Sequence, residues 1–168
     1  MTMKKIDIKT LKESAVSLFD DSRCLITAGN EDSYNTMTAS WGGLGVLWNK
    51  NVAFTFIRPS RYTYEFTQKE DTFSLCFFPE EYRKALTLCG TKSGRDCDKI
   101  KEAGLTPAFV DDVPCFEEAS MIVICKKIYA QKMSADCALT DEIKKHYAED
   151  EPYHTVYVGE ILKVYVKE

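Results

Sequence analysis

Short apolar runs separated by turn residues dominate the pattern along this chain. Residues 24–28 form one such run and end at the turn pair Gly29-Asn30, and residues 52–57 and 73–78 form two others. Runs of this length that are rich in branched and aromatic side chains are typical of buried strands. The run at 52–57 is apolar on both faces and must be covered on both, as in a closed barrel or beneath a helix or partner subunit.

Three longer segments, residues 35–48, 116–129 and 155–166, also favour extended structure. Glycines interrupt the first of them, which indicates a bulge or a close backbone approach, and Asn49-Lys50 is the expected turn into the next strand. The last segment alternates, with Tyr157 and Lys163 on one face. The opposite face is expected to hold Val156, Val158, Leu162, Val164 and Val166.

Helical spacing of apolar residues predicts helices between these strands. The helices are expected from Thr10 to residue 19, after a cap at Ser60, over residues 80–89 up to Gly90, and over residues 96–103 up to Gly104. Because strands dominate, we expect a mainly β (α+β) fold. A small antiparallel barrel with peripheral helices would remove the edges of so many strands.

Length and charge narrow the possible functions. With 168 residues and no linker or repeat, the chain is expected to form a single domain over residues 1–168. Its net charge of -4 argues against general binding to nucleic acid or to anionic membranes. No apolar run approaches the roughly 20 residues of a membrane span. The N-terminus lacks the apolar stretch of a secretory signal, so we expect a cytoplasmic location.

The seven cysteines are odd in number and include no CxxC pair. A disulfide framework or a zinc or iron–sulfur site is therefore not expected. Several cysteines lie within apolar runs, which favours small buried thiols in a reducing cytoplasm. Neither His146 nor His154 has a partner at metal-ligand spacing, and no metal site is expected.

Residues 35–41 carry polar side chains where a core strand would carry branched apolar ones. The polar positions are Asn35, Thr36, Thr38 and Ser40, and the small or apolar ones are Met37, Ala39 and Trp41. This composition suits a flat polar ligand that needs hydrogen bonds at one edge and an apolar wall at the other. By itself, the pattern favours an exposed Ser/Thr-rich strand with one packed tryptophan.

Residues 58–63 hold the donors that a phosphate group needs. Arg58 and Arg61 offer charge-assisted hydrogen bonds, Ser60 and Thr63 offer hydroxyls, and a helix that starts near Tyr62 would turn its first amides toward an anion. The alternative is an ordinary strand-to-helix turn with solvated arginines.

Residues 90–99 form a third polar segment, between two predicted helices. Gly90, Gly94 and the Ser93 hydroxyl allow a close approach to a ligand. The cations Lys92, Arg95 and Lys99 could complete the neutralisation of a phosphate. The segment lacks the GxxxxGK[ST] arrangement of a nucleotide P-loop. The alternative is a solvated, charged connector.

Together, the three segments resemble the flavin reductase-like family, and the flavoredoxins in particular. Those proteins carry an Asn-x-Met-Thr-x-x-Trp strand, then Arg-Pro-x-Arg-Tyr-Thr, then Ser-Gly-[Arg/Lys]-Asp-x-Asp-Lys. The matching residues, in the same order, are Asn35, Met37, Thr38 and Trp41, then Arg58, Pro59, Arg61, Tyr62 and Thr63, then Ser93, Gly94, Arg95, Asp96, Asp98 and Lys99.

The resemblance implies an FMN-binding split barrel, a six-stranded antiparallel Greek-key barrel, assembled as a homodimer with the flavin near the subunit interface. It implies that Asn35, Thr38 and Trp41 contact the ring and ribityl chain, and that the phosphate end is served by Ser60, Arg61, Thr63 and Lys99. It also places His154 near the flavin, whereas His146 is expected to be solvated. The full set of expected cofactor-binding residues is Asn35, Thr36, Met37, Thr38, Ala39, Ser40, Trp41, Arg58, Ser60, Arg61, Tyr62, Thr63, Ser93, Lys99 and His154.

The implied function is that of an FMN-dependent oxidoreductase. It would pass electrons from NAD(P)H or a reduced carrier protein to a flavin or a small acceptor, with no side chain acting as an essential acid or base. There is no GxGxxG strand–helix unit, so a nicotinamide would stack directly on the flavin. Two alternatives remain: a non-catalytic FMN electron carrier between protein partners, and a barrel that stores flavin or binds another ligand.

Overall fold

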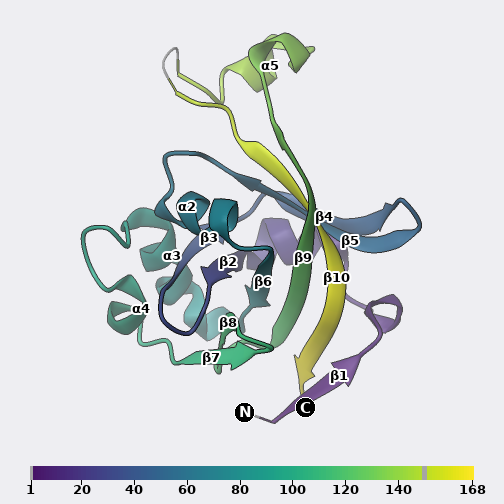
Figure 1. The fold of residues 1–168 in the computed structure, drawn as a ribbon, viewed down its shortest axis with the longest axis vertical. Coiled ribbons are helices and arrows are strands. Elements are labelled where there is room, and N and C mark those ends of the chain that lie inside the picture. The colour runs from purple at the N-terminus through teal and green to yellow at the C-terminus, as the bar shows by residue number, and fades with distance from the viewer. Residues whose placement is uncertain (1, 149–150) are drawn as a thin grey trace.

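The computed structural model describes residues 2–148 and 151–168, and one large antiparallel sheet organises them (Figure 1). The sheet has eight strands in the order β3-β2-β6-β9-β10-β5-β4, with β1 paired to β10. Their bounds are β1 Met3–Ile6, β2 Cys24–Gly29, β3 Tyr34–Ala39, β4 Gly42–Leu47, β5 Lys50–Ile57, β6 Thr72–Phe77, β9 Met121–Lys132 and β10 Thr155–Lys167. A separate hairpin pairs β7 (Pro107–Val110) with β8 (Val113–Phe116).

The mainly β prediction is confirmed, but the sheet is neither six-stranded nor closed. Its path begins at β3 and ends at β4, and the part of the chain that the structure describes has no ladder between these two strands. Only Ser40 and Trp41 connect them. Two residues are too few to carry the chain across an open sheet, so the sheet curls until its two edges meet at this corner. The corner redirects the chain instead of forming a hairpin, which leaves the barrel split.

Short helices surround the sheet (Figure 1). The α-helices are α1 Ala15–Ser17, α2 Tyr62–Lys69, α3 Arg83–Thr91, α4 Lys99–Glu102 and α5 Asp141–Lys144. The 3-10 turns are Ile8–Thr10, Glu80–Tyr82 and Ala135–Cys137, and a π turn spans Leu18–Ser22. Within the described residues, every helix falls short of the length and apolar character needed to cross a bilayer.

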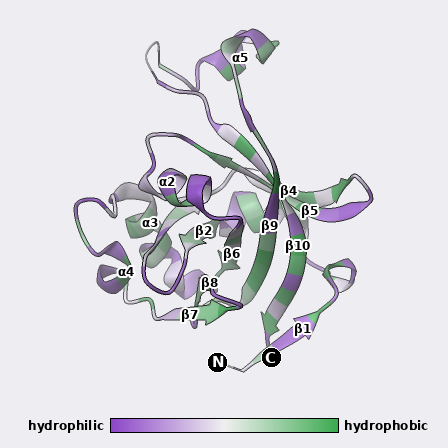
Figure 2. Cartoon of the chain, in the orientation of Figure 1, coloured by the Kyte–Doolittle hydropathy of each residue, from purple (hydrophilic) through white to green (hydrophobic). Residues whose placement is uncertain are grey.

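The central strands are buried on both faces, as their apolar runs predict. In β2, Leu25 packs in a cluster with residues of α3 and β8, while its neighbour Ile26 packs in a second cluster with Phe19 and Leu75. Successive side chains of a strand point to opposite faces, so one strand serves two cores. Figure 2 shows this apolar character along β6 and β9, in contrast to the hydrophilic α4.

All seven cysteines are free thiols, and five of them are buried: Cys24, Cys76, Cys89, Cys115 and Cys125. Burial raises the pKa of Cys76 to about 12 and those of Cys89 and Cys115 to about 11. These thiols therefore stay protonated and act as small apolar side chains, as predicted for the cysteines inside apolar runs.

The predicted helix from Thr10 to residue 19 is wrong. Thr10 does not cap it: the Asp7 side chain caps a 3-10 turn, and the Thr10 hydroxyl donates to the Asp7 carbonyl. Only Ala15–Ser17 is α-helical, and a π turn follows. The Phe19 ring is buried edge-on against Phe77, with ring centroids 5.6 Å apart. Packing of that one ring outweighs the helical spacing of the segment.

Three helix boundaries also differ from the prediction. The N-cap of α2 is Arg61 and not Ser60, and α4 begins only after Asp98, whose side chain accepts the Lys101 amide. Helix α3 continues through Gly90, which is therefore not a stop. A Cβ at Gly90 would lie 3.2 Å from Cβ of Thr38, so this glycine lets the helix pack closely on β3.

The strand predictions need three corrections. The segment 35–48 divides at the corner, and the hairpin turn after it is Trp48-Asn49, both in the left-handed region, in place of Asn49-Lys50. The segment 116–129 contains the end of β8 and a turn before β9 starts. In β10, register shifts interrupt the alternation. As a result Tyr157 is 1% exposed, whereas Leu162 is 47% exposed.

Gly42 and Gly43 provide a matched test of the packing at the corner. A Cβ on Gly42 would overlap the buried Phe19 ring, whereas one on Gly43 would have no neighbour within 4 Å. We expect Gly42→Ala to lower the free energy of unfolding by about 1–3 kcal/mol, and Gly43→Ala to change it by less than about 0.5 kcal/mol. Urea unfolding of both variants measures this difference, and equal losses would show that Phe19 does not fix the corner.

Candidate functional site

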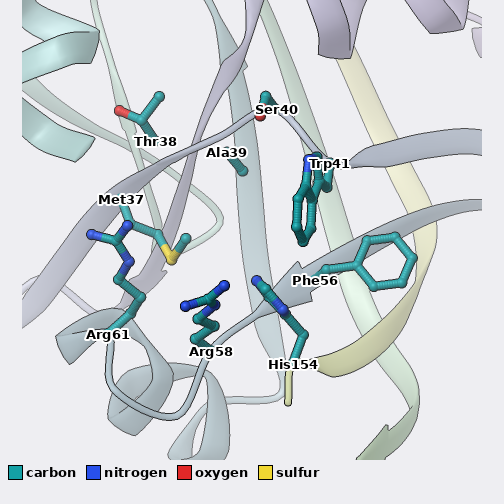
Figure 3. Close-up of a pocket in the computed structure, with 9 residues that line it drawn as sticks. All are labelled: Met37, Thr38, Ala39, Ser40, Trp41, Phe56, Arg58, Arg61 and His154. Atoms are coloured by element: carbon teal, nitrogen blue, oxygen red, sulfur yellow. The ribbon is translucent and has the colours of Figure 1, made fainter. Parts of the chain in front are cut away.

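A cavity of about 300 Å³ opens beside the corner between β3 and β4 (Figure 3). Its wall combines the end of β3, the corner, the end of β5, the turn before α2 and the residue before β10. The residues that line it are Met37, Thr38, Ala39, Ser40, Trp41, Phe56, Arg58, Arg61 and His154. Three parts of the sequence that lie far apart, residues 37–41, 56–61 and 154, thus meet at one place.

The corner explains why the cavity exists. Met37 and Ala39 are buried in the core, which fixes the end of β3. Gly42 lets Phe19 pack beneath the start of β4. Trp41, between them, remains 43% exposed and lies against His154, with ring centroids 5.0 Å apart. A large aromatic surface is therefore left available on the wall of the cavity.

Two arginines make one side of the cavity positive, next to Met37 (Figure 3). Arg61 donates to the carbonyl of Gly90 at 2.8 Å. Arg58 donates to Glu151 at 2.6 Å and to the carbonyl of His146 at 2.9 Å. Both guanidinium groups carry a permanent charge and have donors beyond those used here.

Aromatic groups form the other side, where Trp41, Phe56 and His154 lie together (Figure 3). Burial, with a smaller contribution from Arg58 and Arg61, lowers the pKa of His154 to about 4. Its Nδ1 lies 2.8 Å from the Tyr147 hydroxyl. At neutral pH the imidazole is therefore uncharged, and the positive charge of the cavity belongs to the arginines alone.

Eight residues expected from the sequence line this cavity: Met37, Thr38, Ala39, Ser40, Trp41, Arg58, Arg61 and His154. Seven of them come from the first two motifs, and His154 directly precedes the last strand. The geometry thus brings together a hydroxyl-bearing strand, an indole and two guanidinium groups.

The other seven expected residues lie outside its wall: Asn35, Thr36, Ser60, Tyr62, Thr63, Ser93 and Lys99. Asn35 is buried and donates to the Thr63 hydroxyl at 2.7 Å, which ties β3 to α2. The Thr36 hydroxyl lies 2.8 Å from that of Thr27 on β2. These polar groups satisfy one another within the fold, and Asn35, Tyr62 and Lys99 also line a separate cavity of about 460 Å³.

Lys99 and Ser93 do not reach the cavity because each bonds to backbone nearby. The Lys99 ammonium is buried and donates to the carbonyls of Cys89 and Lys92, at 3.1 and 3.2 Å, at the C-terminal end of α3. Burial lowers its pKa, and Arg61 lowers it further. The Ser93 hydroxyl accepts the Arg95 amide. A cation at the negative end of a helix is a stabilising arrangement.

Sequence reasoning missed Phe56 and the residues between β9 and β10. Phe56 belongs to an apolar strand and gives no signal of a role at a site. His146 is exposed, as expected, yet its ring lies edge-on to Trp41 with centroids 5.6 Å apart. Arg58 also lies over the Tyr147 ring, 5.2 Å from its centroid. These neighbours come from a charged stretch without periodicity, which only the tertiary structure locates.

Solved structures share this fold. An FMN-binding domain of a flavin reductases-like enzyme from Shewanella baltica OS155 is 15% identical, covers 98% of this chain and 77% of its own, and has a TM-score of 0.71. Flavoredoxin of Desulfovibrio vulgaris (Miyazaki F) is 24% identical, with 87% and 69% coverage and a TM-score of 0.68.

A third structure is the FMN-binding protein from Thermus thermophilus with bound p-hydroxybenzaldehyde. It is 20% identical, covers 88% of this chain and 72% of its own, and has a TM-score of 0.68. At these identities the likeness concerns the fold. No curated protein sequence matches the chain.

A protein-family model assigns the chain to a family. The model described as "Flavin reductase like domain" matches residues 19–168, a span that includes all nine residues of the cavity wall. The chain therefore belongs to the flavin reductase-like family.

Proposed function

We propose that the protein binds FMN in the cavity at the corner and acts as an oxidoreductase. Electrons pass from NAD(P)H or a reduced carrier to a flavin or a small acceptor. One observation carries the proposal: two arginines and an aromatic wall with an exposed tryptophan face each other across one cavity, in a chain of the flavin reductase-like family. FMN needs these two environments, one for its phosphate and one for its ring.

The residues present fit that group. Arg61 and Arg58 supply charge-assisted donors for the phosphate, next to the first turn of α2. The end of β3 supplies the Ser40 hydroxyl and the Thr38 hydroxyl, the latter as an acceptor because its proton goes to the Leu86 carbonyl, and Trp41 supplies a flat apolar surface. Bound FMN would contribute the electron-transfer chemistry, while these side chains bind and orient it. Arg58 would exchange its contact with Glu151 for the phosphate.

No side chain of the wall is assigned as an acid or base. His154, which is neutral at pH 7, has one ring nitrogen near the Tyr147 hydroxyl and keeps the other for a hydrogen bond. Its role is to hold a polar atom of the ligand without adding charge. We place the protein in the cytoplasm, where its seven free thiols stay reduced.

An electron carrier is the second candidate. Trp41 is 43% exposed at the cavity, so a protein partner could approach a bound flavin directly. This accessible indole favours exchange of electrons with a protein as well as with a small molecule.

We further propose a homodimer, supported by an apolar surface on the side of the β4–β5 hairpin. Trp48 is exposed at the tip and contacts Tyr129, with ring centroids 5.7 Å apart, and Val46 on β4 is also exposed. Exposed aromatic side chains of this kind are enriched at protein interfaces. Analytical ultracentrifugation gives the oligomeric state, and a monomer at micromolar concentration would contradict the assembly.

Substitution of Arg61 tests whether this residue binds the phosphate of FMN and not its ring. We expect Arg61→Ala to weaken FMN at least about tenfold, the loss of one charge-assisted contact, but to weaken riboflavin, which lacks the phosphate, less than about threefold. Arg83→Ala, on α3 outside the cavity wall, is the control and should leave both affinities unchanged. Flavin fluorescence titration measures them. Equal weakening of the two flavins by Arg61→Ala would place the phosphate elsewhere.

Rapid mixing distinguishes a reductase from a carrier. If the protein is a reductase, mixing the FMN-loaded protein anaerobically with NADH or NADPH will bleach the flavin band at a rate that rises with nucleotide concentration. Stopped-flow absorbance measures this, with free FMN as the control. Bleaching by a reduced carrier protein alone would support the second candidate, and no reduction by either donor would contradict both.

His154 should make stability depend on pH. Its folded pKa of about 4 lies below the unfolded value of 6.5, so the unfolded state takes up a proton first on acidification. The free energy of unfolding of the cofactor-free protein should therefore fall from pH 6.5 to pH 4, by up to about 3 kcal/mol from this group. Urea unfolding of His154→Gln should lack this part of the decrease, and the exposed His146→Gln should keep it. Parallel profiles for wild type and His154→Gln would contradict the assignment.

A further inference from the structure

One hydrogen bond joins the wall of the cavity at the corner to a residue outside that wall. The Tyr147 hydroxyl lies 2.8 Å from Nδ1 of His154. His154 lines the cavity, whereas Tyr147 does not and belongs to the segment between β9 and β10. Tyr147 can therefore act on the site only through His154.

Three neighbours fix the Tyr147 ring. Tyr153 stacks on it, with ring centroids 3.8 Å apart and an angle of 15° between the ring planes. The Arg58 guanidinium lies over it, 5.2 Å from the centroid, and the His154 ring lies edge-on to it at 5.6 Å. A phenol ring packed in this way has little freedom to turn, so its hydroxyl is held at Nδ1 of His154.

The surroundings of the hydroxyl favour Tyr147 as the donor in this hydrogen bond. Within residues 2–148 and 151–168, Nδ1 of His154 is its only hydrogen-bond partner, so its proton has no other acceptor in the described protein. A phenol oxygen shares a lone pair with its ring and accepts less well than an imidazole nitrogen. The Arg58 cation over the ring makes that oxygen a still weaker acceptor.

The charges of Arg58 and Arg61 act in the opposite direction, because they favour a bare imidazole nitrogen on the side of the cavity. Glu151 compensates the charge of Arg58 at 2.6 Å. In the part of the chain that the structure describes, neither arginine donates to the His154 ring. The bond from Tyr147 is direct and acts at shorter range than these charges, so we expect it to decide which nitrogen carries the proton.

We propose that Tyr147 is a positioning residue, which donates to Nδ1 of His154 and holds this side chain as the neutral tautomer with the proton on Nε2. A neutral imidazole has one N–H and one bare nitrogen, so fixing Nδ1 as the acceptor makes Nε2 the donor. The His154 ring lies among the side chains of the wall (Figure 3), and its Nε2–H is offered to the ligand.

The fixed tautomer makes the site selective for a hydrogen-bond acceptor at this point. A carbonyl oxygen or an unprotonated ring nitrogen meets that requirement, and the isoalloxazine ring of FMN carries both. The identity of this acceptor rests on the proposed function, whereas the tautomer of His154 depends on protein side chains alone.

NMR of the cofactor-free protein tests the tautomer. Long-range ¹H–¹⁵N spectra of protein labelled with ¹⁵N-histidine show which ring nitrogen carries the proton at pH 7, and His146→Gln assigns the signals. We expect Nε2 of His154 to be protonated in the wild type. Tyr147→Phe keeps the ring and removes only the hydroxyl, so it should shift His154 toward the tautomer with the proton on Nδ1, which the arginines favour.

Tyr153→Phe is the matched control, because it removes the other hydroxyl of the same stack. It should keep the wild-type signature of His154. A proton on Nδ1 in the wild type, or an unchanged signature in Tyr147→Phe, would overturn the proposal.

Flavin affinities test the consequence for the ligand. Tyr147→Phe should weaken FMN and riboflavin by the same factor, about two- to fivefold, because only the fraction of molecules with Nε2 protonated can donate to the ring. Tyr153→Phe should change neither affinity. Flavin fluorescence titration measures both. Unchanged affinities, or weakening of FMN alone, would show that His154 does not donate to the ring and would overturn the proposal.

The NMR experiment needs no flavin, so this inference and the proposed function can fail separately. If neither flavin binds but Nε2 is protonated in the wild type and not in Tyr147→Phe, the flavin assignment fails and Tyr147 still fixes His154. If both flavins bind and Nδ1 carries the proton in the wild type, the role of Tyr147 fails and the flavin site stands.

Discussion

The two-residue corner between β3 and β4 is the constraint on which the site depends. It joins strands at opposite ends of the sheet path, so the sheet must curl until its edges meet there. The same corner brings the hydroxyl-bearing end of β3 opposite the turn that carries Arg58 and Arg61. Gly42 is part of this arrangement, because only a residue without a side chain leaves room for Phe19 beneath it. The shape of the cavity is thus a consequence of core packing.

The C-terminal end of α3 is a second organising feature, and it acts through backbone carbonyls. Arg61 donates to Gly90, and Lys99 donates to Cys89 and Lys92. The Thr38 hydroxyl donates to Leu86 one turn earlier. The last carbonyls of a helix lack partners within it, so they attract cations and hydroxyl groups. This helix end therefore holds Arg61 in place and keeps Lys99 on the backbone, away from the cavity that the sequence alone suggests for both.

The sequence predicts the structure best where residue types and hydrophobic periodicity indicate the same element. The apolar runs of β2, β5 and β6 predict buried strands because short runs with branched and aromatic side chains on both faces are typical of strands that are covered on both faces. The roles of Trp41 and the two arginines are predictable through the order of three family motifs, because the residue types of β3 alone favour an exposed strand with a packed tryptophan. Asn35 and Thr36 look equally suitable, yet their polar groups bond to Thr63 and Thr27. Which polar side chains face a ligand and which satisfy the fold depends on partners far away in sequence. The residues between β9 and β10 show no pattern that predicts a role at the site. Only the tertiary structure places His146 of this segment against Trp41.

Arg58 connects the cavity at the corner with a neighbouring cavity of about 340 Å³, which is lined by Trp41, Phe56, Met133, Ile143, His146 and Tyr147. Its guanidinium lines the first cavity, pairs with Glu151 and lies over Tyr147, whose ring lines the second. Trp41 and Phe56 belong to both walls. An anion bound in the first cavity would therefore compete with Glu151 and the His146 carbonyl for the Arg58 guanidinium. Because a buried or partly buried cation is costly to leave without a partner, the position of Glu151 and the charge in the first cavity are energetically linked through this one side chain.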